Sequence, residues 1–114
     1  MSKKEQTDSK DLLARAIEMV GMIGYQEASV VSRTIMNKKT GTITLFAFDK
    51  GQALSEHTAP YDALVYILEG EAEVTISGKV TRLGKGEMIN MPASESHALK
   101  AVEKYKMLLI MIKS

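Results

Sequence analysis

From residue 28 onward, the chain is a series of short segments rich in Val, Ile, Thr, Phe and Tyr, separated by breaks that contain glycine. Side chains of these types favour strands, and the Glu69-Gly70 and Ser77-Gly78 pairs suit tight hairpins because glycine tolerates a positive φ angle. We predict strands near residues 29–36, 42–48, 53–58, 63–69, 71–77, 79–83, 87–91, 96–102 and 105–112. So many short strands, with hardly any helix among them, indicate an antiparallel β-sandwich or β-barrel.

Length and composition limit the classes of protein that remain. A chain of 114 residues with 45% hydrophobic and 25% charged residues suits one folded domain. Its 15 Lys and Arg and 14 Asp and Glu give a net charge of +1, without the basic excess that nucleic-acid binding needs. The chain has no cysteine, which excludes disulfides and thiolate metal ligands and fits a reducing compartment.

No segment suggests a membrane span or a secretion signal. The longest apolar run, residues 107–112, is far too short to cross a bilayer. Charged residues interrupt the apolar positions near the N-terminus, so we expect no secretion signal there. We therefore expect a cytoplasmic protein with neither nucleic acid nor a membrane as its partner.

The first part of the chain has a different pattern from the rest. We predict an N-terminal helical segment over residues 1–27, followed by a barrel domain over residues 28–114. Between residues 11 and 23, apolar side chains recur at the spacing of one helix face, at Leu12, Leu13, Ala16, Ile17, Val20 and Ile23. Such a helix is expected to pack across the barrel or a neighbouring subunit, and less commonly binds a membrane surface or a partner.

Two of the predicted strands are apolar on both faces. Alternate side chains of residues 63–68 and 105–112 point to opposite faces of a sheet, yet both sets are apolar. One face can fill the barrel, and the other needs a cover because small proteins rarely expose a large contiguous apolar patch. A second copy related by a two-fold axis is the simplest cover, so we expect a homodimer. The N-terminal helix is the competing cover.

Residues 51–101 resemble the two sequence motifs of the small single-domain cupins. The landmarks that match in register are Gly51, His57, Gly70, Gly86, Pro92 and His97. The resemblance implies an all-β fold, the cupin jelly roll or double-stranded β-helix barrel, to which this chain would add its N-terminal α-helix. It also implies that the two histidines belong to one site.

The resemblance to the cupins is incomplete at the metal site. In that family, three His and one Glu bind a divalent metal, but here Ala59 and Ala63 stand at the second His and the Glu positions. Two imidazoles alone hold such a cation weakly. The resemblance therefore implies either no metal or a weakly bound Zn, Ni, Fe or Mn on His57 and His97. Asp62 is a candidate third ligand, although strand alternation points it away from the face of Ala63.

His57 and His97 are the only histidines in the chain, and both occupy cupin ligand positions. Imidazole titrates near neutral pH, so the pair could act as a catalytic acid and base or could orient a bound ligand. Two cationic rings would repel each other in one apolar pocket, so at least one should be neutral at pH 7. The alternative is that both are buried polar side chains without a function.

Because Ala59 and Ala63 stand where the cupin motif has two polar metal ligands, we expect a pocket around these histidines to have largely apolar walls. The candidate ligand-binding wall residues are Phe46, Phe48, Tyr61, Met91, Met107 and Met111, each of which could instead belong only to the core.

Three hypotheses about function follow from these residues. The first is a cytoplasmic cupin that binds a small organic molecule in the barrel pocket, with weakly bound metal or none. The second is a metal-dependent enzyme, an oxygenase or isomerase, that acts on a small carbonyl or sugar-derived compound. The third is an oligomerising or partner-binding unit with an inactive pocket.

Overall fold

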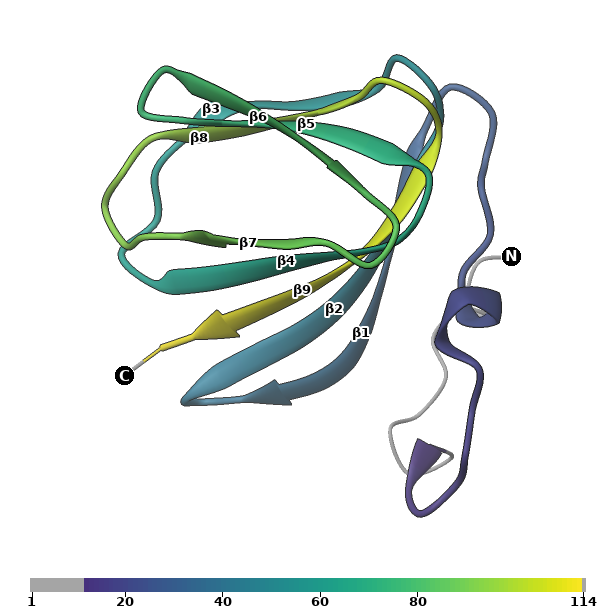
Figure 1. Ribbon diagram of the computed structural model, residues 1–114. Coiled ribbons are helices and arrows are strands. Elements are labelled where there is room, and N and C mark those ends of the chain that lie inside the picture. The colour runs from purple at the N-terminus through teal and green to yellow at the C-terminus, as the bar shows by residue number, and fades with distance from the viewer. Residues whose placement is uncertain (1–11, 114) are drawn as a thin grey trace.

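The computed structural model describes residues 12–113 and consists mainly of strands (Figure 1). The strands are β1 (Val30–Lys38), β2 (Gly41–Phe48), β3 (Ala53–His57), β4 (Asp62–Glu69), β5 (Glu71–Ile76), β6 (Lys79–Gly84), β7 (Met88–Met91), β8 (His97–Ala101) and β9 (Tyr105–Ile112). Each predicted strand is present, with its ends shifted by no more than two residues. The all-β fold class expected from the sequence is therefore confirmed.

The strands form two antiparallel sheets that face each other (Figure 1). The five-stranded sheet has the order β1-β2-β9-β4-β7, and the four-stranded sheet has the order β3-β8-β5-β6. Because side chains alternate along a strand, one set from each sheet fills the space between them. The largest fully buried side chains of this interior include Phe48, Val65, Ile67, Val74 and Tyr105.

Two turns that contain glycine connect consecutive strands of the barrel. Ser77 and Gly78 have φ angles of 47° and 84°, as the tight β5–β6 hairpin requires. Gly70, with a φ of 85°, links β4 in one sheet to β5 in the other. A Cβ atom at Gly70 would lie 2.0 Å from the carbonyl oxygen of Lys104, so only glycine fits there.

The predicted N-terminal α-helix is wrong for the residues that the structure describes. Residues 12–23 contain no α-helix, and Met19–Met22 form a short 3-10 turn labelled η3. The carbonyl of Val20 accepts a hydrogen bond from Lys106 Nζ at 2.6 Å, and that of Met22 accepts one from Arg33 at 2.7 Å. Within an α-helix, these two carbonyls would accept hydrogen bonds from backbone amides of the same helix, but here they accept them from side chains of the barrel. Residues 1–11 of the predicted helical segment lie outside the described residues.

Residues 12–28, which we call the N-terminal strap, lie against the outer face of the five-stranded sheet (Figure 1). Ile23 is buried there against Leu45 and Ala47 of β2. The Tyr25 hydroxyl donates a hydrogen bond of 2.6 Å to the Glu69 carboxylate at the end of β4. The strap thus covers one end of this face. Within residues 12–113, no helix is long and apolar enough to cross a membrane.

Candidate functional site

Two strands of the four-stranded sheet bring the histidines together. β3 pairs with β8 in an antiparallel register that places His57 directly opposite His97, with an irregularity in β3 between Leu54 and His57. Along β8, the buried positions alternate, so His97 points inward with Leu99 and Ala101. His97 is 7% exposed, whereas His57 at the end of β3 is exposed to solvent.

The two imidazole rings contact each other directly. Their Nε2 atoms lie 3.1 Å apart, and the rings meet edge to face with 4.3 Å between centroids. The Nδ1 atom of His57 lies 2.8 Å from the carbonyl oxygen of Ser55, and that of His97 lies 3.3 Å from the carbonyl oxygen of Glu95. A carbonyl oxygen can only accept, so each Nδ1 carries the hydrogen and each neutral ring would present a lone pair at Nε2.

Two facing lone pairs at this distance would repel each other. The contact becomes favourable when one proton, or one cation, lies between the two Nε2 atoms. Burial lowers the pKa of His97 from its ordinary value of 6.5, and the positive charge of His57 lowers it further, against the opposing effect of the Glu95 carbonyl. His97 is therefore the ring that stays neutral, and its Nε2 atom is the acceptor when a proton lies between the two rings.

The pair lies at the wall of a small, largely apolar cavity inside the barrel. The cavity has a volume of about 60 Å³ and is lined by Leu54, His57, Ala59, Tyr61, Ala63, Met91, His97, Leu99, Leu109 and Met111. A water molecule occupies about 30 Å³ in the liquid, so this volume suits two waters or a few ligand atoms. The two alanines at the positions of the absent cupin ligands contribute methyl groups to its wall.

The structure brings together some of the residues that the sequence singled out and separates others. Tyr61, Met91 and Met111 line the cavity with the histidines. Phe46, Phe48 and Met107 do not line it and belong to or pack against the core cluster, where Phe48 stacks on Tyr105 with 4.6 Å between ring centroids. Whether any lining residue binds a ligand stays a prediction.

Sequence reasoning missed three leucines of the cavity wall. Leu99 is two positions after His97 and therefore lies on the same face of β8. Leu109 is two positions before Met111 and therefore lies on the same face of β9. Strand periodicity alone could have identified both of these once the histidines were placed on the inner face. Leu54 lies before the irregularity in β3, so periodicity counted back from His57 does not place it.

The residues present do not fit a resident divalent ion. An Nε2 separation of 3.1 Å is compatible with two neighbouring imidazoles on one ion at 2.0–2.1 Å from each, but stable sites generally use three or more protein ligands. Asp62 is exposed, and its carboxylate accepts a 2.8 Å hydrogen bond from the Ala93 backbone. Glu56 accepts a hydrogen bond from Ser96. Over residues 12–113, no three side chains of His, Cys, Asp or Glu converge on a point where a metal could bind.

The chain is similar to cupin proteins along most of its length. A family model of the cupin domain matches residues 44–113. A conserved protein of unknown function from Streptococcus pyogenes is 39% identical, with 89% of each chain covered and a TM-score of 0.85. A cupin superfamily protein from Desulfitobacterium hafniense is 29% identical over 89% of this chain and 93% of that chain, with a TM-score of 0.84.

A third solved structure shares the barrel but belongs to a longer chain. It is a cupin 2 conserved barrel domain protein from Leptotrichia buccalis, 39% identical over 82% of this chain and 46% of that one, with a TM-score of 0.80. A comparison with functionally curated proteins found no significant match. These descriptions name no ligand or reaction, so the chemistry has to be argued from the site.

Proposed function

Because the chain belongs to the cupin family, we propose that it binds a small organic molecule in the barrel cavity at His57 and His97, without a resident metal ion. The observation that carries this proposal is the 3.1 Å contact between the two Nε2 atoms at the wall of an apolar cavity. Ligand sites are typically apolar concavities with a few polar groups that orient the ligand. The chain contains no cysteine, which supports a cytoplasmic setting for this function.

The cavity restricts the ligand to a small one. About 60 Å³ accommodates only a few heavy atoms, such as a carboxylate or carbonyl group with a short apolar substituent. The polar group would face the imidazoles, and the substituent would contact Met91, Leu99 or Met111. A larger ligand would have to project past the exposed His57.

The shared proton supplies chemistry as well as orientation. When a proton lies between the rings, a ligand oxygen that enters there can accept it, and His97 remains as a neutral base. The pair therefore offers one acid and one base on the same side of a bound ligand. This arrangement suits recognition of an anionic or carbonyl ligand, and it also suits proton transfer within that ligand.

A metal-dependent oxygenase or isomerase is the second candidate, and the Nε2 separation is compatible with it. Both imidazoles could serve as neighbouring ligands of one ion, but the site would need a third donor. Asp62 would have to leave the Ala93 amide to provide it, or the ligand itself would have to contribute the donor. The hydrogen bond of Asp62 therefore makes this candidate weaker than the metal-free one.

Two measurements on the same protein test the proposal. Protein purified without a metal-affinity column should contain less than stoichiometric divalent metal by elemental analysis. In two-dimensional NMR, formate and acetate should shift the amide signals of residues around the cavity, and His57→Gln should weaken this effect at least tenfold.

The exposed Lys79→Gln variant, on β6, which contributes no residue to the cavity wall, is the matched control and should respond as the wild type does. One tightly held metal ion per chain would overturn the metal-free proposal. Amide shifts confined to the barrel exterior, or unchanged in His57→Gln, would overturn the cavity as the binding site.

A further inference from the structure

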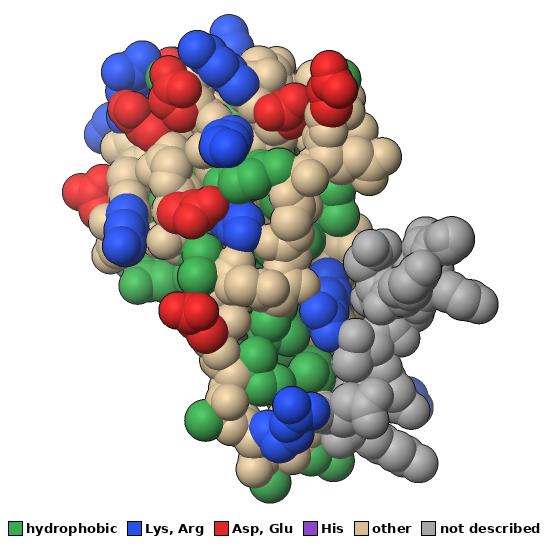
Figure 2. Space-filling model, turned by 90° about the vertical axis from the view of Figure 1, so that its right-hand side faces the viewer, with side chains coloured by type: hydrophobic (Ala, Val, Ile, Leu, Met, Phe, Trp, Pro, Cys, Tyr) green, Lys and Arg blue, Asp and Glu red, His purple; other side chains and the backbone are tan. Residues whose placement is uncertain are grey.

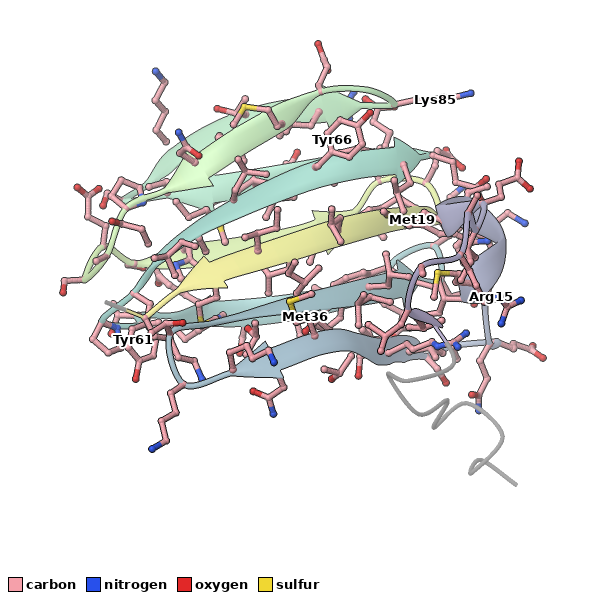
Figure 3. The ribbon with its side chains drawn as sticks, turned by 90° about the horizontal axis from the view of Figure 1, so that it is seen from below. Arg15, Met19, Met36, Tyr61, Tyr66 and Lys85 are labelled. Atoms are coloured by element: carbon pink, nitrogen blue, oxygen red, sulfur yellow. The ribbon has the colours of Figure 1, made fainter. Side chains whose placement is uncertain are left out.

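Tyr61 lies at the end of the barrel where solvent reaches the histidines. It belongs to the connection between β3 and β4, and in Figure 1 this connection is at the left-hand end, where β9 also ends. Figure 3 shows Tyr61 at the same end. Figure 2 views the opposite end of the barrel, and no histidine side chain shows among its coloured residues. Because His57 is exposed where β3 ends, the cavity is approached beside Tyr61.

The Tyr61 ring has the cavity on one side and a lysine on the other. Tyr61 lines the cavity together with His57 and Met111, and it is half-buried. The Nζ atom of Lys113 lies 5.7 Å from the centroid of the Tyr61 ring. Lys113 itself does not line the cavity. The ring therefore separates the cavity from the ammonium group of Lys113.

The backbone on both sides of Tyr61 is bonded to the turn that precedes β8. The carbonyl of Ala59 accepts a hydrogen bond of 2.7 Å from the amide of Ser94. The carboxylate of Asp62 accepts one of 2.8 Å from the amide of Ala93. With its backbone held in this way, the Tyr61 ring moves chiefly by rotation about its side-chain bonds, between discrete rotamers.

Lys113 is itself held beside the ring. Its backbone amide donates a hydrogen bond of 2.7 Å to the carbonyl of Thr40, just before β2. A cation within about 6 Å of an aromatic ring is attracted to the face of that ring, and at a partly exposed site the attraction favours the contact about two- to fivefold. The contact with Lys113 therefore favours the rotamer in which the Tyr61 ring closes the cavity.

The closed ring limits how far a bound ligand can extend. A carboxylate at the imidazoles would place its carbon chain against Leu109 and Met111, but the cavity of about 60 Å³ holds only a few heavy atoms. Formate and acetate suit this space. The chain of a longer acid needs the space that the ring of Tyr61 occupies, or has to leave past the exposed His57.

We propose that Tyr61 determines the ligand length that the cavity accepts, and that Lys113 is a positioning residue that holds the Tyr61 ring in its closed rotamer. This inference rests on the proposed binding of a small ligand at His57 and His97. It narrows the ligand class to the shortest carboxylates, and it assigns the exclusion of longer aliphatic acids to a single side chain.

A titration series with acetate, butyrate and hexanoate tests this inference, with the amide signals of the cavity residues followed by NMR. The measured quantity is the affinity for hexanoate divided by the affinity for acetate, because a general loss of positive charge weakens both acids alike and leaves this ratio unchanged. In the wild type, the ratio should be below about one tenth, since each methylene that a pocket does not accommodate costs roughly tenfold or more.

Three variants separate the contributions of the ring, the hydroxyl and the lysine. Tyr61→Ala should raise the ratio at least tenfold, whereas Tyr61→Phe keeps the ring and should retain the wild-type ratio. Lys113→Gln should raise the ratio about two- to fivefold through the lost contact with the ring. Lys85→Gln is its matched control, because Lys85 is exposed at the opposite end of the sheet in Figure 3, and it should leave the ratio unchanged.

The outcomes distinguish this inference from the proposed function beneath it. If no acid shifts the cavity signals in any variant, both are wrong. If acetate binds but Tyr61→Ala leaves the ratio unchanged, or if Tyr61→Phe raises it as much as Tyr61→Ala does, only the role of Tyr61 is overturned. An unchanged ratio in Lys113→Gln would overturn the role of Lys113. Circular dichroism checks folding, and Tyr61→Leu replaces Tyr61→Ala if that variant does not fold.

Discussion

Lowering the pH below 6.5 should destabilise the fold through His97. Burial and the neighbouring charge of His57 lower the pKa of His97, so the folded protein resists taking a second proton on this pair. The unfolded chain titrates both histidines near 6.5 and therefore binds one more proton than the folded protein once the pH falls below that value. Stability then decreases as the pH falls, until the pH reaches the lowered pKa of folded His97.

A difference of one proton sets the size of the effect. The free energy of unfolding should decrease by at most about 1.4 kcal/mol for each pH unit below 6.5. For a domain of this size, a loss of 1 kcal/mol lowers Tm by roughly 4 °C. Asp and Glu mostly titrate below about pH 5, so the window between pH 6.5 and 5 isolates the histidines.

Urea unfolding of the wild type and of His97→Gln across this window provides the assay. The variant keeps His57 but lacks the buried ring, so its stability should change much less between pH 6.5 and 5. Equal slopes in the two proteins, or a wild type that gains stability as the pH falls, would refute the reasoning.

Three further changes test other parts of the structure. Gly70→Ala should lower the free energy of unfolding in urea far more than Gly51→Ala, because both glycines have a φ of 85° but only Gly70 has backbone atoms within 3 Å of the added Cβ. Gly51→Ala is the control and should lose about 1–2 kcal/mol from the positive φ alone. Equal losses in the two variants would contradict the predicted clash. Ala59→His places a third imidazole on the cavity wall and should raise zinc affinity by calorimetry at least tenfold over the wild type; an unchanged affinity would show that this position does not reach the pair. Tyr25→Phe removes one of the hydrogen bonds between strap and sheet, so hydrogen exchange at residues 20–24 should accelerate while exchange in the central strands stays the same. Unchanged exchange in the strap would mean that this bond does not hold it.

The strands could be predicted from the sequence because two local signals agree. Alternating apolar runs and turns such as Ser77-Gly78 both depend on neighbouring residues only. The motif spacing also placed His57 and His97 at the positions that the β3–β8 register pairs. In the four-stranded sheet, the positions predicted from local motif spacing are therefore the same positions that pair across β3 and β8.

The N-terminal helix and part of the cavity wall could not be predicted for a different reason. The strap has a helical pattern, but Lys106 and Arg33 bond to its carbonyls from distant strands, which no local pattern records. Alternation places Phe48 and Met107 on the inner face correctly, yet it does not say how far along the barrel each lies from the histidines. Those positions depend on the order of the strands in the sheet.

The shared proton of the histidine pair is the central claim, and nitrogen-15 NMR of the imidazole rings measures it directly. The chain has only two histidines, so the long-range spectrum contains two ring systems, which His57→Gln assigns. At pH 7, we predict hydrogen on both Nδ1 atoms and a bare Nε2 on His97 that faces the His57 ring. Two neutral rings that titrate independently, or a His97 ring with its hydrogen on Nε2 and none on Nδ1, would contradict the account.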